Sequence, residues 1–369
     1  MNEINLKLHL RACIQKVATG PEYSKDLSYD EAYHAMRHIL AGDADEVQTA
    51  IYLISLRMKR ETDEENRGTL QALIDTATIS QANVDEVVDI SDPYDGYTRG
   101  VPGSTFVPVV LATMGVPAVL HGLNEVGPKF GATHHKILQA ADVDTSLLPE
   151  GATQQLESIG WTYIDQAQFV PRLHDLIPLR QRMIKRQILT TTETMLGPIR
   201  GQQKTHYMGG YVHKAYPPIY ASLARHTGFA SAMFIRGVEG GVIPSLQQSG
   251  RLFYYHGEGG EQQRDLSPKD VSIEASTRAI PLPADLPPAP MISDEIAATV
   301  DSDALAERAA ALGIAALGGE KGLMYDSLVY SASICLSHLG KYADIAEAAD
   351  AVRAVLDSGK ALETLRAAA

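Results

Sequence analysis

Helical periodicity dominates the first part of the chain. Between residues 5 and 80, apolar positions recur at intervals of three and four, and Gly42 interrupts the pattern. Ser28 and Glu31 have the Ser-x-x-Glu spacing of a capping box, in which each side chain satisfies a free backbone N–H at the start of a helix. We therefore expect a series of helices in this segment, one of which begins at Ser28.

The pattern changes near residue 86 to an alternation of strands and helices. Val87 to Ile90 is a short β-rich run, which a turn-rich loop and the apolar stretch Phe106 to Met114 follow. A second β-rich run, Ala118 to Leu120, again ends in a glycine-containing loop. This alternation is typical of βαβ units around a parallel sheet. Further strands are expected at Ala232 to Ile235 and at Arg251 to Tyr255, the latter in a hairpin.

A proline-rich segment marks the last change in the sequence pattern. Residues 281–290 contain five prolines, which exclude a helix or a central strand and indicate a surface connection. The alanine-rich segment from Asp294 to Ala369 is expected to be helical, including the run Asp326 to Leu336. The predicted fold class is therefore α/β, with a small N-terminal helical domain, a larger α/β domain with a central, mainly parallel sheet, and C-terminal helices.

Composition narrows the class of protein. A chain of 369 residues with 45% hydrophobic and 21% charged residues is ordinary for a globular protein. The first residues lack the apolar core of a signal peptide, and no run approaches 18 apolar residues, so we expect a soluble, cytoplasmic protein that does not engage a membrane. Cys13 and Cys335 lie more than 300 residues apart and are expected to be buried small hydrophobes.

Charge is unevenly distributed along the chain. The formal net charge is −13, which argues against a protein that is basic throughout. The segment 172–225 nevertheless holds nine Lys and Arg against two acidic residues, so it carries +7 and the remainder −20. Four tyrosines, which either stack on bases or belong to the core, lie in the same segment: Tyr207, Tyr211, Tyr216 and Tyr220.

Several blocks, in order, resemble the anthranilate phosphoribosyltransferase family. They include Gly42-Asp43, Leu56 through Glu65, His121-Gly122, Leu196-Gly197-Pro198 and Asp357 through Ala361. The resemblance implies a dimerising helical domain at 1–85, which helices from about 180–205 complete, an α/β domain at 86–369 with the proline-rich connection 281–290, and a cleft between them. It also implies a homodimer and a place in a pathway like tryptophan biosynthesis.

The chain departs from the motifs that hold magnesium and pyrophosphate in that family. The family's Gly-Thr-Gly-Gly-Asp loop is replaced by Asp92 through Arg99, where Pro93 lacks a donor and two tyrosines add bulk. The Asp-Glu pair that binds Mg²⁺ falls at Val242-Ile243, which cannot ligate a metal. No metal site and no catalytic residue are therefore assigned, and Mg²⁺ is expected as a cofactor only if phosphoribosyl transfer survives.

What remains of the family pattern is suited to anions. Ser104 and Thr105 open a helix, where they bind an anion or act only as caps. Four basic residues, Arg180, Arg182, Lys185 and Arg186, are expected within two helical turns, either as a solvated face or around an anion. The complete set of candidate anion-binding residues is Asp95, Gly96, Arg99, Ser104, Thr105, His121, Gly122, Lys129, Gly131, Arg180, Arg182 and Arg186.

Two functions follow from these observations. The first is phosphoribosyl transfer to an aromatic amine or base by a divergent, even inactive, site, whose partner is a phosphorylated small molecule. The second is a non-catalytic, nucleic-acid-binding paralogue that uses a basic cleft, because Arg99 and the stretch from Arg180 to Pro198 look closer to a bacterial paralogue group with such members. Fold alone does not decide between them.

Overall fold

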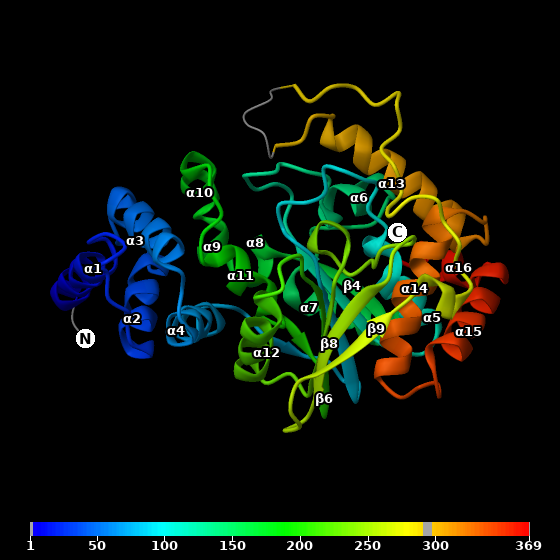
Figure 1. Cartoon of the computed structure of the whole chain (residues 1–369), viewed down its shortest axis with the longest axis horizontal. Coiled ribbons are helices and arrows are strands. Elements are labelled where there is room, and N and C mark those ends of the chain that lie inside the picture. The colour runs from blue at the N-terminus through cyan, green and yellow to red at the C-terminus, as the bar shows by residue number, and fades with distance from the viewer. Residues whose placement is uncertain (1–2, 291–296, 369) are drawn as a thin grey trace.

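The N-terminal helices form a bundle at one end of the molecule (Figure 1). The computed structural model describes residues 3–290 and 297–368. Ser28 and Glu31 form the predicted capping box at the start of the second helix, and Thr62 and Glu65 form another at the fourth. The four helices are α1 (Glu3–Val17), α2 (Tyr29–Leu40), α3 (Glu46–Lys59) and α4 (Asp63–Ile74).

A seven-stranded sheet forms the centre of the larger part of the chain. Its strand order is β4-β3-β2-β6-β7-β8-β9, in which the first five strands are mutually parallel and the last two pairings are antiparallel. The predicted α/β class is thereby confirmed, as is the hairpin of β8 and β9. The strands are β2 (Glu86–Ser91), β3 (Ala118–Gly122), β4 (Trp161–Asp165), β6 (Lys204–Gly210), β7 (Ser231–Ile235), β8 (Gly250–His256) and β9 (Gln262–Leu266). A small separate sheet pairs β1 (Ser80–Gln81) with β5 (Ile199–Arg200).

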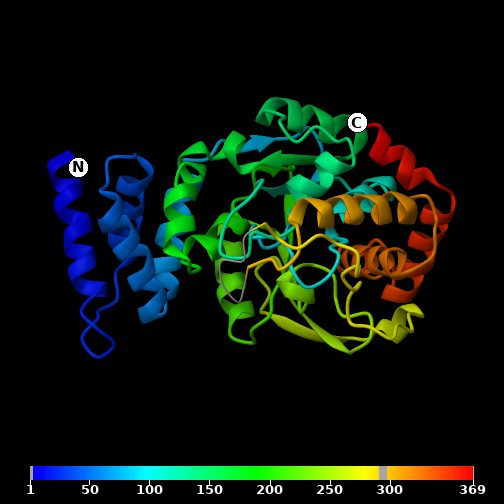
Figure 2. The same cartoon turned by 90° about the horizontal axis from the view of Figure 1, so that it is seen from above.

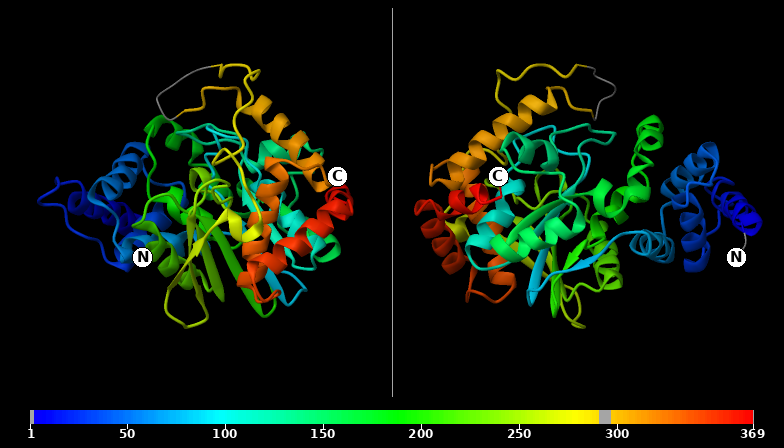
Figure 3. Two further views of the ribbon diagram at one scale, coloured as in Figure 1. Left: turned by 45° about the vertical axis from the view of Figure 1, so that its right-hand side comes forward. Right: turned by 180° about the vertical axis from the view of Figure 1, so that it is seen from behind.

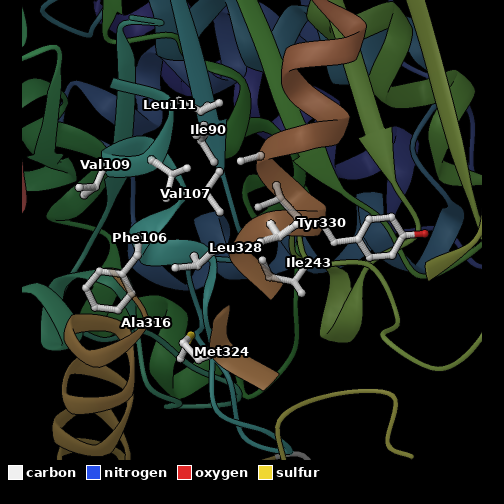
Figure 4. Close-up of a cluster of buried hydrophobic side chains, with 14 of the residues drawn as sticks. Ile90, Phe106, Val107, Val109, Leu111, Ile243, Ala316, Met324, Leu328 and Tyr330 are labelled. Carbon is white, nitrogen blue, oxygen red and sulfur yellow. The ribbon is translucent and has the colours of Figure 1, made fainter. Parts of the chain in front are cut away.

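Helices cover both faces of the sheet (Figures 2 and 3). One core contains Val88 and Ile90 of β2 together with side chains of five helices: α5 (Val107–Thr113), α13 (Ser302–Leu317), α14 (Leu323–His338), α15 (Ile345–Asp357) and α16 (Lys360–Arg366). Part of this core is drawn in Figure 4. Phe106, at the end of the 3-10 turn η1 (Ser104–Phe106), packs so closely on α13 that a Cβ at Gly313 would lie 2.0 Å from its ring.

The opposite face of the sheet shares its core with the helical bundle. Val87 of β2 and Val119 of β3 pack in one cluster with Leu53 and Leu70 of the bundle. Two helices of the α/β part contribute to the same cluster, α7 (Pro149–Ile159) and α12 (Tyr216–Thr227). The side-chain alternation of the strands therefore divides their residues between two cores, one of which joins the bundle to the sheet.

Short helices connect the sheet to the bundle. They are α8 (Gln166–Phe169), α9 (Pro171–His174), α10 (Ile177–Met183) and α11 (Leu189–Thr192). In this region α10 contacts α3, and α11 contacts α4. Residues 281–290 form an irregular connection whose side chains are exposed or half-buried. Cys13 and Cys335 are both buried and free, as expected. In the described ranges, no helix combines the length and apolarity needed to cross a bilayer.

Candidate anion-binding cleft

A cavity of about 650 Å³ opens where β2 and β6 end. These strands are neighbours from which the sheet grows in opposite directions, β2 towards β3 and β6 towards β7, so their carboxyl ends form a topological switch point. Ligands of open α/β sheets bind at such crevices. Arg57 of α3 lies on the bundle side, and the α/β part supplies the rest of the lining, including residues 91–93, 98–99, 210–213, 237–240 and 278–279.

The lining is basic although the protein is acidic. Five cationic side chains border the cavity, whereas Asp92 and Glu239 are its only acidic residues among those described. Positive charges that converge in a low-dielectric crevice attract anionic ligands. The five cations are Arg57, Arg99, Lys129, Arg186 and Arg278.

Aromatic rings form another part of the wall. Tyr216 and Tyr220 lie one turn apart on α12 with ring centroids 5.4 Å apart, and Arg57 Nη1 donates a 2.8 Å hydrogen bond to the Tyr216 hydroxyl. Tyr207 and Tyr211 also line the cavity, although both are nearly buried. All four tyrosines of the basic segment thus border one site. Hydroxyl groups of α11 and the following turn add polar lining: Thr190, Thr191 and Thr194.

Asp92 is buried and is surrounded by groups that interact with its carboxylate. It is 2% exposed and accepts hydrogen bonds from Tyr97 Oη (2.6 Å), from Ser104 Oγ and from Val242 N (2.9 Å), while His134 Nε2 lies 3.4 Å away. Burial opposes its ionisation, but the nearby His134 imidazole and the hydrogen bonds from Ser104 and Tyr97 outweigh burial and lower the pKa of the Asp92 carboxyl. The negative charge of Asp92 is therefore stabilised by donors of the protein itself.

Two glycines allow the loop Asp92 through Arg99, called the first loop below, to lie against residues 129–132. Gly96 has φ +76°, and a Cβ there would lie 2.7 Å from the Gly131 carbonyl carbon. A Cβ on Gly131 would lie 2.4 Å from the Tyr97 oxygen, and Tyr97 and Ala132 form an antiparallel bridge. Only glycine fits this contact, so both glycines have a packing role.

Lys129 and Glu239 meet at the edge of the cavity. Lys129 Nζ donates to Gly96 O at 2.8 Å and to Glu239 Oε2 at 3.2 Å. The Glu239 carboxylate also accepts from the backbone N–H groups of Thr98 and Arg99 and from the Thr98 hydroxyl. The donors that the first loop directs toward the cavity are therefore already hydrogen-bonded to Glu239.

Several predicted site residues do not reach the cavity. Ser104 and Thr105 are fully buried, and the Thr105 hydroxyl pairs with His134 Nδ1 at 2.8 Å. His121 is enclosed between Tyr94 and Asp89, with Nε2 3.0 Å from the carboxylate. Gly122, Gly96, Gly131 and Asp95 also lie outside the lining. Of the twelve predicted residues, the cavity brings together Arg99, Lys129 and Arg186.

The basic run after residue 180 does not form one helical face. Helix α10 ends at Met183, since Ile184 has φ +64°, so Arg186 lies beyond it. Arg180 is 3% exposed and makes a bidentate ion pair with Glu193, at 2.7 and 2.6 Å. Arg182 pairs with Glu46 of α3, and Arg186 pairs with Asp95 at 2.7 Å. The expectation of a contiguous run over two helical turns was wrong, because each arginine has a carboxylate partner in a different direction.

The residues present do not fit a magnesium site. Val242 and Ile243 are buried and apolar. Asp92 is already surrounded by donors, and the Glu239 carboxylate is 3.2 Å from an ammonium group that a cation would have to displace. Across residues 3–290 and 297–368, no group of three or more His, Cys, Asp or Glu side chains converges as metal ligands would.

Sequence reasoning missed part of the lining. Arg57 lies inside the helical block Leu56 through Glu65, where the basic residues Lys59 and Arg60 a few positions later were the available signal. Arg278 and the threonines of α11 carry no local motif. Glu239 follows a strand and precedes two glycines, which is a common position for site residues in α/β proteins.

Three comparisons with known proteins agree with this architecture. A family model described as "Glycosyl transferase family, helical bundle domain" matches residues 11–77. An anthranilate phosphoribosyltransferase of Aquifex aeolicus is 24% identical over 358 residues, 96% of each chain, and one of Erythrobacter litoralis is 29% identical over 92% of this chain and 94% of its own. An uncharacterised Aquifex aeolicus protein is 27% identical over 64% of this chain and 70% of its own.

Solved structures show the same fold. The anthranilate phosphoribosyltransferase of Thermus thermophilus superposes with a TM-score of 0.74 at 21% identity over 97% of both chains. That of Saccharomyces cerevisiae, solved with PRPP and Mg, superposes with a TM-score of 0.75 at 14% identity over 98% of this chain and 96% of its own. The similarity therefore extends over the bundle, the sheet and the C-terminal helices.

Proposed function

Since this chain belongs to the anthranilate phosphoribosyltransferase family, we propose that it keeps the family's cleft as an anion-binding site but uses it to hold single-stranded nucleic acid without magnesium-dependent transfer. The observation that carries this proposal is the cavity lining, in which five cations and four tyrosines converge at the switch point of the sheet. The residues that would hold magnesium are apolar or already paired.

The exposed cations are available to phosphates. Arg99 and Arg278 border the cavity and have exposed side chains, and Arg236 is exposed just beyond β7. Guanidinium groups donate several hydrogen bonds in a fixed plane, which suits phosphate oxygens. Lys129 and Arg186 already have carboxylate partners, so they contribute less.

The aromatic wall supplies a surface for bases. Tyr216 and Tyr220 are half-buried, so their rings border the cavity while they also pack against the core. Stacking of a base on an exposed aromatic side chain contributes about 1–3 kcal/mol and tolerates any base. A groove that combines such rings with arginines is the usual arrangement of proteins that bind single strands without sequence preference.

The second candidate is phosphoribosyl transfer to an aromatic amine or base, as in tryptophan biosynthesis. It is favoured by the extent of the similarity, since six relatives named as anthranilate phosphoribosyltransferases match 92–97% of this chain. Transfer requires stabilisation of a departing pyrophosphate, and in this chain Lys129 and the first-loop N–H groups are engaged by Glu239. The geometry therefore favours binding.

We also propose that residues 1–85 form a dimerisation unit of a cytoplasmic homodimer, with 86–369 as the α/β unit and 281–290 as its connection. The bundle exposes apolar side chains on α1 and α3, namely Leu8 (58%), Val47 (67%), Ile51 (39%) and Met58 (78%). Exposed apolar surface of this kind marks interfaces. Two free, buried cysteines are compatible with a reducing compartment.

The test is fluorescence anisotropy of a labelled single-stranded oligothymidylate over a salt series. We expect binding that weakens linearly in log salt, and we expect Arg99→Gln and Arg278→Gln each to lower the slope by about 0.7, the value for one phosphate contact on a single strand. Arg366→Gln removes one charge from the exposed end of α16, away from the cavity, and serves as the matched control.

Phosphoribosyl pyrophosphate with Mg²⁺ is the competitor that separates the two functions. Under the binding proposal it does not displace the oligonucleotide specifically and gives no product with anthranilate. Absence of oligonucleotide binding at low salt, or turnover of anthranilate, would refute the proposal and support the transferase.

A further inference from the structure

The first loop and Lys129 together present a set of anion donors. Thr98 N lies 3.2 Å from Glu239 Oε2, Arg99 N lies 2.8 Å from Oε1, and the Thr98 hydroxyl lies 3.4 Å from Oε2. Lys129 Nζ completes the set at 3.2 Å. Two successive backbone N–H groups, a hydroxyl and an ammonium are the donors that ordinarily receive a phosphate oxygen.

The Glu239 carboxylate, which is distant in sequence, accepts hydrogen bonds from all of these donors. Glu239 follows β7 and lies 141 positions from Thr98 and 110 from Lys129. Its side chain is 9% exposed. Because one carboxylate satisfies all these donors, a compact anion that entered the cavity would find the donors engaged and would meet a like charge at close range.

The backbone at Glu239 has an unusual conformation that places the carboxylate among these donors. Glu239 has φ +52°, a region that residues other than glycine rarely adopt. The turn around it is tight, because a Cβ at Gly237 would lie 1.7 Å from Gly241 O. Such strain persists where surrounding contacts hold it and is concentrated at functional sites.

We propose that Glu239 is a specificity-determining residue that acts as an internal anion, closing the cradle of Thr98, Arg99 and Lys129 to pyrophosphate and other compact polyanions. The phosphates of an extended ligand then meet the exposed guanidinium groups of Arg99 and Arg278 instead. The inference deepens the proposed function and rests on it only for the identity of that extended ligand.

The test is isothermal titration calorimetry of inorganic pyrophosphate, without metal, into the full-length protein. Glu239→Gln keeps the side-chain shape and removes the charge, whereas Glu239→Gly removes the carboxylate and suits the positive φ. We expect both variants to bind pyrophosphate at least about tenfold more tightly than wild type, since a like charge is removed and the donors are freed. Lys129→Met in the Glu239→Gln background should abolish the gain.

The matched control is Glu320→Gln, an exposed carboxylate after α13, which should leave pyrophosphate binding as in wild type. Wild-type binding as tight as that of both variants, or folded variants that gain nothing, would overturn the proposal. Loss of the fold in both variants would overturn it too, because Glu239 would then be structural. If the variants gain pyrophosphate while wild type binds no oligonucleotide, only the proposed function fails.

Discussion

Replacing Arg180 should destabilise the fold rather than weaken a ligand. Arg180 and Glu193 are 3% and 1% exposed, and two hydrogen bonds of 2.7 and 2.6 Å join them. Gln166 Nε2 donates a third hydrogen bond to Glu193 at 3.0 Å. Arg180→Ala leaves the Glu193 carboxylate buried with one neutral donor, and removing one partner of a buried ion pair costs about 3–5 kcal/mol.

The control lies two residues further along the same helix. Arg182 is exposed and pairs with Glu46 at the surface, so Arg182→Ala should cost less than about 1 kcal/mol. Urea unfolding followed by far-UV circular dichroism and by fluorescence of Trp161, the single tryptophan, measures both variants. The double variant Arg180→Met/Glu193→Leu should recover much of the loss, because a well-packed apolar pair avoids the unpaired charge.

The reasoning is refuted if Arg180→Ala is no less stable than Arg182→Ala. If Arg180→Ala also retained stability but lost ligand binding, the interpretation of Arg180 as a ligand contact would be restored. A stable double variant that binds oligonucleotide as wild type does would assign Arg180 to the fold alone.

Three further predictions follow from single contacts. Burial lowers the pKa of His206 to about 4 and of His338 to about 3, so below pH 6.5 the unfolded chain binds more protons than the folded chain, and stability decreases as the pH is lowered. Each histidine should account for about 2–3 kcal/mol of lost stability at pH 4.5. Acid unfolding of His338→Gln should therefore begin at a lower pH than that of wild type, and an unchanged midpoint would contradict this. Gly96→Ala, at φ +76° and 2.7 Å from Gly131, should lower the melting temperature and impair oligonucleotide binding, whereas an unchanged melting curve would exclude the tight contact. Ile51→Asp should give a monomer in light scattering after size exclusion with an unchanged circular dichroism spectrum, and a persisting dimer would place the interface elsewhere.

Local patterns in the sequence were sufficient for β2, β3, β7 and β8 and for their order, but they did not indicate β4 or β6. Ser28 and Glu31 cap α2 because a capping box needs only residues three apart. The βαβ alternation from Val87 onward predicted the parallel sheet, and Arg251 to Tyr255 predicted the hairpin, because side-chain periodicity and turn residues act over a few positions. The apolar Val242-Ile243, where the family resemblance places a magnesium-binding pair, likewise predicted without any structure that this pair is missing.

The charged residues of the cleft required the tertiary structure. A lysine or arginine has the same local sequence whether it faces solvent, a ligand or a buried carboxylate, and only the fold supplies its partner. Arg186 meets Asp95 across 91 positions and Lys129 meets Glu239 across 110, while Arg180 turns inward to Glu193. The sequence by itself therefore determined the family resemblance and the α/β class, whereas contacts between distant segments decided which basic groups of the cleft have a carboxylate partner.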